Sequence, residues 1–191
     1  MSRSLASAAA PAAAMTPLPR VEGTCPTLLT AAIRREVRLR GSWQDTADRV
    51  AAALRRHLPG PGLLSREQLA GDPAGYQTHL VHAESDGSFS IAVMVWRPGQ
   101  VTPIHDHLSW CVTAVLQGTE YEEIFALHEG RLRVVARNEN PAGTVSGFAP
   151  PGDIHQVRNR GTGIAVSMHV YGTDITRVGN SIRREYSLPT P

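Results

Sequence analysis

Two histidines separated by one residue, His105 and His107, form the first pattern in this sequence that could do chemistry. They follow the Pro98-Gly99 turn and lie at the mouth of a predicted β-strand. On a strand, the side chains at i and i+2 leave the same face, about 6–7 Å apart along the chain. Both imidazoles could therefore bind one metal ion, with Asp106 on the opposite face. The alternative is a pair of surface or half-buried histidines at the end of a strand.

A second stretch, Pro150 to Asn159, strengthens the interpretation of His105 and His107 as metal ligands. The two stretches together resemble the two motifs of the cupin superfamily. The first motif is matched by Gly99, His105, His107 and Gly118, and the second by Pro150, Gly152, His155 and Asn159. The resemblance implies a mainly β fold, a jelly-roll-like cupin barrel that is double-stranded and antiparallel, here with N-terminal α-helices. It also implies that His105, His107 and His155 bind one divalent metal ion inside the barrel.

The first motif departs from the cupin pattern at Cys111, which stands where cupins usually carry a glutamate ligand. The implied metal would then have three neutral imidazole ligands and would keep its full +2 charge. About three positions of an octahedron would stay open, as in the facial triads of non-haem iron oxygenases. Such a site favours an anionic substrate, and a thiolate suits it because metal binding lowers the pKa of a thiol.

Near the end of the chain, Ser167-Met168-His169-Val170-Tyr171 alternates three polar side chains onto one face of a predicted strand. Together with the run around His105, it resembles cysteine dioxygenase and its bacterial thiol dioxygenase relatives. The resemblance implies one Fe(II) per chain, and O2 and a small-molecule thiol as substrates that yield a sulfinic acid. It also implies a hydrogen-bonded catalytic relay of Ser167, His169 and Tyr171, with the tyrosine hydroxyl near the iron. Taken alone, the pattern also fits an ordinary barrel strand with a satisfied polar pair.

Cys111 aligns with the cysteine that forms a thioether with the active-site tyrosine in mammalian-type enzymes of this family. A Cys111–Tyr171 cross-link is therefore a hypothesis, and a buried, inert cysteine is the alternative.

The substrate-binding residues match the family less well. The cysteine enzymes carry an arginine two residues after a tyrosine, and the mercaptopropionate enzymes carry glutamine there. Here Tyr76 is followed by Gln77 and Thr78. Without the arginine, a substrate carboxylate loses a bidentate partner, and Arg184 is a candidate replacement, with Arg177 and Arg183 as alternatives. The expected substrate is cysteine or a related thiol such as 3-mercaptopropionate, and the alternative is a bulkier thiol such as ergothioneine.

The elements that must position these residues divide the chain in two. Apolar spacing and capping signals predict helices over 26–40, 43–58 and 65–70, the second capped by Ser42 and Asp45. From residue 76, short apolar runs alternate with turn signals and predict strands over 78–82, 89–97, 110–117, 120–127, 131–137, 144–148, 154–159 and 163–171. We expect one domain over 23–191, with a helical part over 26–70 and the barrel over 76–175.

Residues 1–22, rich in Ala and Pro, are expected to form a disordered tail. A cloning remnant and a misassigned start, with Met15 as the second candidate, are the alternatives. The tail lacks the apolar core of a secretory signal, so a cytoplasmic location is expected by default.

Composition excludes several other classes. The chain has 191 residues, and its 19 basic residues, all arginine, nearly balance 17 acidic ones. This argues against nucleic-acid binding driven by charge, and the absence of lysine excludes lysine nucleophiles. No apolar run is long enough for a membrane span, and two cysteines make no disulfide framework. Nothing in the sequence specifies an oligomeric state.

Three rival functions remain on sequence grounds. They are a non-catalytic metal-binding cupin, a cupin isomerase or different dioxygenase using Mn, Ni or Zn, and a zinc hydrolase. The hydrolase lacks an evident general base, because Glu120, Glu122 and Glu123 are expected on a solvated strand. The strand carrying Ser167, His169 and Tyr171 favours the thiol dioxygenase, since the other classes have no reason to hold it.

Overall fold

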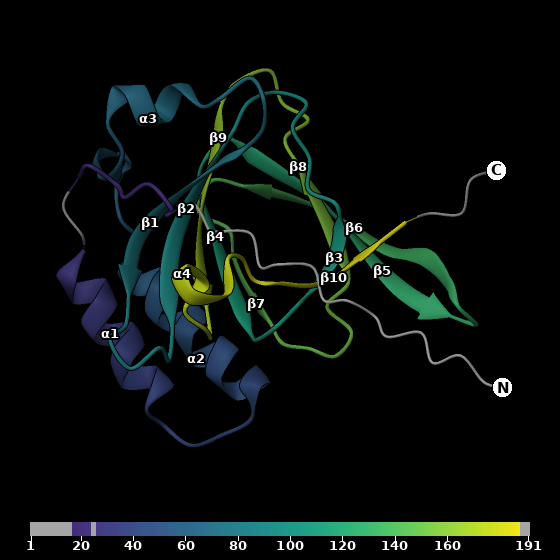
Figure 1. Ribbon diagram of the computed structural model, residues 1–191, viewed down its shortest axis with the longest axis horizontal. Coiled ribbons are helices and arrows are strands. Elements are labelled where there is room, and N and C mark those ends of the chain that lie inside the picture. The colour runs from purple at the N-terminus through teal and green to yellow at the C-terminus, as the bar shows by residue number, and fades with distance from the viewer. Residues whose placement is uncertain (1–16, 24–25, 188–191) are drawn as a thin grey trace, which may run out of the picture.

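The computed structural model describes residues 17–23 and 26–187. It contains two antiparallel five-stranded sheets, and two long helices lie against the first of them (Figure 1). The sheet orders are β1-β2-β9-β4-β7 and β10-β3-β8-β5-β6. The helices are α1 (Thr27–Val37), α2 (Trp43–Arg56), the 3-10 turn η1 (Pro61–Leu63), α3 (Arg66–Ala70) and α4 (Ile175–Val178). The strands are β1 (Gln77–Ala83), β2 (Ser90–Trp96), β3 (Ile104–His107), β4 (Cys111–Gln117), β5 (Thr119–His128), β6 (Arg131–Pro141), β7 (Val145–Phe148), β8 (His155–Arg158), β9 (Ala165–Tyr171) and β10 (Ile182–Tyr186).

This architecture is the mainly β, double-stranded antiparallel barrel with N-terminal helices that the sequence predicted. The capping box at the start of α2 is also present: the Asp45 amide donates to the Ser42 hydroxyl, and the Ser42 amide donates to the Asp45 carboxylate. None of the helices among the described residues is long and apolar enough to cross a membrane.

The structure differs from the sequence prediction in several places. The first helix ends at Val37 rather than residue 40, ahead of Gly41, whose positive φ suits a chain reversal. The segment after β9, the strand of Ser167, His169 and Tyr171, forms α4 and β10, which no apolar pattern in the sequence indicated. Residues 1–16 of the predicted tail lie outside the described residues, but Pro19 and Val21 hydrogen-bond to Leu80 of β1. The end of that tail is therefore joined to the first sheet.

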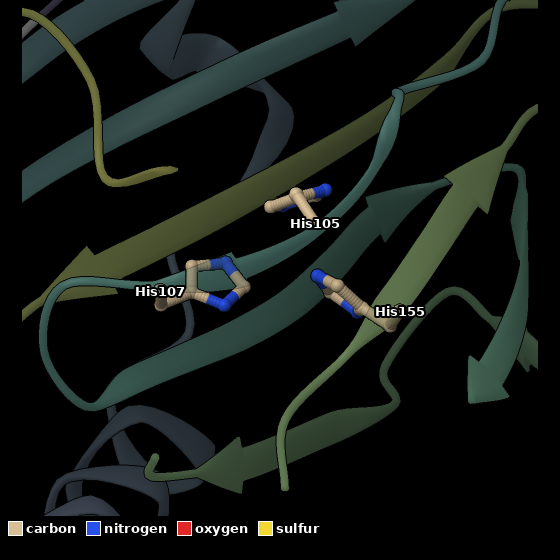
Figure 2. A group of neighbouring side chains, drawn as sticks. All are labelled: His105, His107 and His155. Carbon is tan, nitrogen blue, oxygen red and sulfur yellow. The ribbon is translucent and has the colours of Figure 1, made fainter. Parts of the chain in front are cut away.

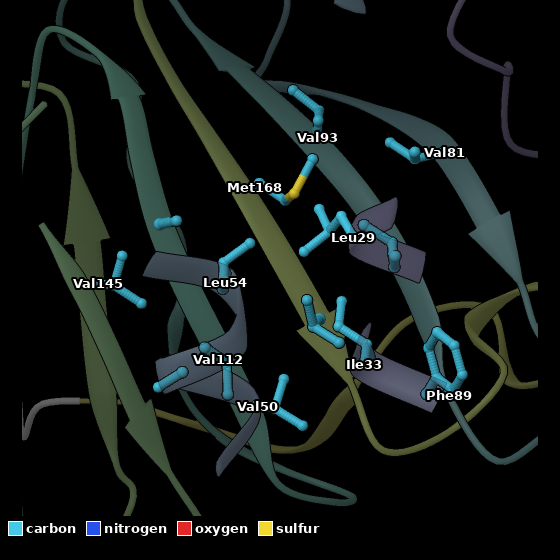
Figure 3. Close-up of a cluster of buried hydrophobic side chains, with 14 of the residues drawn as sticks. Leu29, Ile33, Val50, Leu54, Val81, Phe89, Val93, Val112, Val145 and Met168 are labelled. Carbon is cyan, nitrogen blue, oxygen red and sulfur yellow. The ribbon is translucent and has the colours of Figure 1, made fainter. Parts of the chain in front are cut away.

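The main apolar core lies between the first sheet and the two long helices, outside the barrel (Figure 3). Leu29 of α1 and Leu54 of α2 pack with Val93 of β2 and Met168 of β9, and all four side chains are fully buried. The strands β2 and β9 are therefore covered on both faces, and their opposite faces point into the barrel. Because side chains alternate along a strand, each of these strands contributes one face to the core and the other to the site.

Candidate metal centre and pocket

Three histidine rings converge inside the barrel from two neighbouring strands (Figure 2). His105 and His107 come from β3, and His155 comes from β8, where it stands opposite His105 in the antiparallel register. One ring nitrogen from each histidine lies within 4.8 Å of the others, and all three residues are buried. The strand pairing thus brings residues about fifty positions apart in the sequence to one point.

The other nitrogen of each ring is held by an oxygen atom. His105 Nδ1 lies 2.9 Å from the Pro103 carbonyl, His107 Nδ1 lies 3.1 Å from Asp153 Oδ2, and His155 Nδ1 lies 2.7 Å from Glu122 Oε1. A carbonyl or carboxylate oxygen accepts here, so each Nδ1 carries the hydrogen and each Nε2 keeps its lone pair. This arrangement is the usual one around metal-binding histidines.

Electrostatics also suit a cation between the rings. Burial lowers the pKa of His105 to about 3 and that of His107 below its ordinary value, with the neighbouring imidazoles contributing in the same direction. Both rings are therefore neutral near pH 7, as metal ligands must be. The three histidines fit one divalent metal ion.

The three polar residues of β9 all point into the barrel beside the histidines. Ser167 Oγ lies 2.9 Å from His169 Nε2, and the Trp96 indole donates to Ser167 Oγ at 3.1 Å. The Tyr171 ring stacks on the His169 ring, with 5.8 Å between the ring centroids. Ser167 and His169 thus lie within hydrogen-bond distance of each other, whereas Tyr171 contacts His169 through its ring face. The catalytic role of these three residues stays a prediction.

Cys111 stands directly opposite Tyr171, because β4 pairs with β9 in that register. Side chains paired in this way have Cβ atoms about 4.5–5.5 Å apart. Both residues belong to one small buried cluster with Ala92 and Ile175, and burial raises the pKa of the thiol and of the phenol well above their ordinary values. The structure therefore brings the two residues of the hypothetical cross-link together.

A cavity of about 110 Å³ opens beside the three histidines. Tyr76, directly before β1, and Thr78 of β1 line it, whereas Gln77 faces the other side of the strand, as alternation requires. The Tyr76 ring lies against Trp96, with 4.6 Å between the ring centroids, and Asn180 and Ser181 also line the cavity. No arginine lines this cavity among the residues that the structure describes.

The sequence profile of the family described as cysteine dioxygenase type I matches residues 67–180, which span β1 to β9 and both histidine motifs. The chain belongs to the cysteine dioxygenase type I family. Its barrel is also similar to solved cupins. A protein of Thermus thermophilus is 21% identical with a TM-score of 0.45, over 57% of this chain and 94% of that one.

Two further cupin structures give similar values. An RmlC-like cupin protein of Desulfovibrio desulfuricans is 25% identical with a TM-score of 0.40, over 53% of this chain and 86% of that one. An oxalate oxidase in complex with glycolate is 19% identical with a TM-score of 0.43, over 53% of each chain.

Within this member of the cysteine dioxygenase family, Arg184 is not placed where a substrate could use it. It lies on β10, and its guanidinium donates to Asp106 Oδ2 at 2.8 and 3.1 Å, beside the Tyr186 hydroxyl. The prediction that Asp106 points away from the metal site is consistent with this pairing. The expected role of Arg184 in binding a substrate carboxylate is therefore not supported, because the register of β10 on β3 turns it outward.

The expectation that Glu120, Glu122 and Glu123 lie on a solvated strand is wrong for the first two. Glu120 is only 3% exposed, and the Glu122 carboxylate holds His155. Glu123 alone faces outward and pairs with Arg137 and Arg158. The sequence indicates part of this arrangement, because the alternation of side chains after the Gly118 turn places Glu120 and Glu122 on one face of the strand. Which face is inside was set by the pairing of β5 with β8.

Glu122 and Asp153 were not identified from the sequence as the residues that hydrogen-bond the ligand histidines. Replacing Glu122 tests that role directly. Glu122→Gln removes the charge that orients His155, and we expect divalent metal to bind about 10–100-fold more weakly. Glu123→Gln, one residue along and on the outer face, is the matched control and should leave affinity unchanged. Competitive titration with a metal-binding dye measures both. Equal affinity in the two variants would contradict the role of Glu122.

Proposed function

We propose that this protein is a non-haem Fe(II) thiol dioxygenase that uses O2 to convert a small thiol into its sulfinic acid, with one iron per chain on His105, His107 and His155. The observation that carries the proposal is a cluster of three histidines, joined by no carboxylate from the described part of the chain, next to the strand of Ser167, His169 and Tyr171. Membership of the cysteine dioxygenase family supports it. The net reaction places both atoms of O2 on the thiol sulfur.

A ferrous ion held by the three imidazoles would supply the redox chemistry that joins dioxygen to a thiolate. The chain itself binds the substrate and excludes water. Met94, Trp96 and Val157 line the cavity with apolar surface, and Tyr171 directs its phenol into it. The stacked His169 ring holds that phenol in place, so that its hydroxyl can donate to the substrate headgroup or to a reacting oxygen.

The cavity favours a small thiol as substrate. Its volume of about 110 Å³ is below the roughly 150 Å³ in which a protein cavity holds a benzene molecule. Cysteine and 3-mercaptopropionate fit this size better than ergothioneine, which remains the alternative. Because no arginine lines the described part of the cavity, hydroxyl and amide groups of Tyr76, Thr78, Asn180 and Ser181 are the side-chain partners that it offers to a substrate carboxylate.

The deciding experiment loads the full chain with Fe(II) without oxygen, and then measures O2 consumption over a panel of thiols. The panel should hold cysteine, 3-mercaptopropionate, their amides, and ergothioneine. We expect product with two added oxygen atoms, both from isotopically labelled dioxygen, for at least one small thiol. The zinc-loaded chain is the control. If iron binds but no thiol is oxidised, the protein is better described as a non-catalytic metal-binding cupin.

Tyr171→Phe should lower kcat by roughly 100-fold, the usual loss for one hydrogen-bond donor at a reacting oxygen, while iron stays bound. Tyr121→Phe is the matched control, because it removes the same hydroxyl from a strand residue outside the cavity. Tyr121 lies on β5 with Arg160 over its ring. Sulfinate production and iron content are measured in both. Undiminished turnover in Tyr171→Phe would remove that residue from the mechanism.

We further propose that a thioether forms between Cys111 and Tyr171 during turnover, since the two face each other across β4 and β9. The S–H bond of Cys111 and one ring C–H bond of Tyr171 are replaced by a C–S bond, and O2, the oxidant of the proposed reaction, takes up the two hydrogens with their electrons as H2O2. The expected mark is a peptide pair joined with the loss of two hydrogens. Peptide mapping by mass spectrometry after many turnovers tests this. Both residues recovered unmodified would leave Cys111 as an inert buried thiol.

A further inference from the structure

The Leu18 side chain lines the cavity beside the three histidines, although it comes from the stretch that was expected to be a disordered tail. It packs against the small buried cluster of Ala92, Cys111, Tyr171 and Ile175. Leu18 therefore forms part of the apolar wall of the cavity next to Tyr171. No step of the function proposed above uses this side chain.

The N-terminal segment that carries Leu18, residues 17–23, runs beside β1 (Figure 1). The Leu80 amide donates to the Pro19 carbonyl at 2.7 Å, and the Val21 amide donates to the Leu80 carbonyl at 3.0 Å. The segment can pair in this way because β1 is an edge strand of the first sheet and has backbone groups to offer. Val21 also packs against the main apolar core. The backbone that follows Leu18 is thus held in one place.

Gln68 of α3 holds the same segment from the other side. Its side-chain amide donates to the Arg20 carbonyl at 2.8 Å, and its Oε1 atom accepts from the Glu22 amide at 3.1 Å. Gln68 is itself fixed, because it is buried and forms the capping box of α3 with Ser65. A buried side-chain amide with its hydrogen bonds satisfied on both ends specifies one arrangement of its partners.

Gly23 lets the end of the segment approach η1 more closely than a residue with a side chain could. A Cβ atom at this position would lie 2.5 Å from the carbonyl oxygens of Gly62 and Leu63, which belong to the backbone and cannot rotate away. The Gly23 amide also donates to the Leu63 carbonyl at 3.2 Å. The position of the segment therefore depends on glycine at residue 23.

We propose that Leu18 is a specificity-determining residue that limits the bulk of the thiol admitted to the cavity. The inference deepens the proposed function and rests on it for the class of substrate, whereas the place of Leu18 in the cavity wall does not depend on that function. One methylene more or less in an apolar pocket changes selectivity by about 10–200-fold. A leucine held in the wall by its hydrogen-bonded segment therefore has a large effect on which ligands fit.

The test measures the size selectivity of the full chain loaded with cobalt(II), without O2. One pair of probes is imidazole and 4-phenylimidazole, neutral metal ligands that differ only by a phenyl group. The other pair is 3-mercaptopropionate and the bulkier ergothioneine. Visible absorption of the cobalt ion reports binding, and the ratio of the two Kd values in a pair gives the selectivity. In Leu18→Ala, the bulkier probe of each pair should gain about 10-fold or more relative to the smaller one.

Matched variants separate the wall from a general disturbance. Leu28→Ala makes the same change at a leucine of α1 that is 75% exposed, and it should leave both ratios as in the wild type. Gly23→Ala should shift the ratios in the same direction as Leu18→Ala, because it displaces the segment and leaves Leu18 itself intact. Gly60→Ala is its control, since a Cβ there meets nothing within 4 Å. Thermal unfolding checks that each variant is folded.

An imidazole ratio that is unchanged in a folded Leu18→Ala protein would overturn the proposal, because that variant removes the side chain itself. A shift in Leu18→Ala with none in Gly23→Ala would overturn the role of the segment in holding Leu18. The imidazole pair needs neither a thiol nor O2. A chain that shows the shift with imidazoles but binds no thiol would keep the wall and contradict the proposed function, so the two failures are distinguishable.

Discussion

Replacing His155 by alanine should lower the affinity for iron by far more than the 10–100-fold expected when a residue that hydrogen-bonds a ligand histidine, such as Glu122, is replaced. The reason is that His155 alone joins the site from β8, opposite His105. Without it, two imidazoles remain on one short strand, and two ligands hold a divalent ion weakly. The half-buried Glu122 carboxylate also loses the imidazole partner of its Oε1 and keeps the Asn138 amide on its Oε2.

Iron per chain after anaerobic loading and gel filtration measures the effect. His128→Ala, which removes an exposed histidine at the end of β5, is the matched control and should keep one iron per chain. Thermal unfolding checks that the His155 variant is folded. A folded His155→Ala protein that still holds a full equivalent of iron would show that the metal binds elsewhere.

Glu120→Gln should stabilise the protein at alkaline pH relative to the wild type. The folded state raises the pKa of Glu120 from 4.5 to about 7, so it binds this proton more tightly than the unfolded state does. The stability from that proton is complete below pH 4.5 and is lost as pH rises through about 7. The pKa difference corresponds to about 3 kcal/mol.

The measurement is the free energy of unfolding by urea, for both chains under the same metal loading, at several values of pH. Glutamine has no proton to lose, so the difference between variant and wild type should grow by about 3 kcal/mol between acid and alkaline conditions. Glu123→Gln is the control, because its carboxylate is paired with two arginines and partly exposed. A difference that does not change with pH would mean that Glu120 titrates normally.

The local patterns of the sequence were sufficient for much of the site. The single-residue spacing of His105 and His107, and the alternation of Ser167, His169 and Tyr171, fix which side chains share a strand face, because a strand has a period of two residues. The capping box at Ser42 is equally local, since its atoms lie within one helical turn. The two histidine motifs also carried the family and the fold, which depend on short runs of consecutive residues.

Strand pairing decided the rest. Alternation places Glu120 and Glu122 on the same face of β5, but only the neighbouring β8 makes that face the inside of the barrel. In the same way, the register of β10 on β3 places Arg184 opposite Asp106. The two form an ion pair, and Arg184 does not reach the cavity. These outcomes were not in the local pattern, because burial and charge pairing depend on residues far away in the chain. A carboxylate on a strand is a solvated charge or a buried support according to what the opposite strand presents to it.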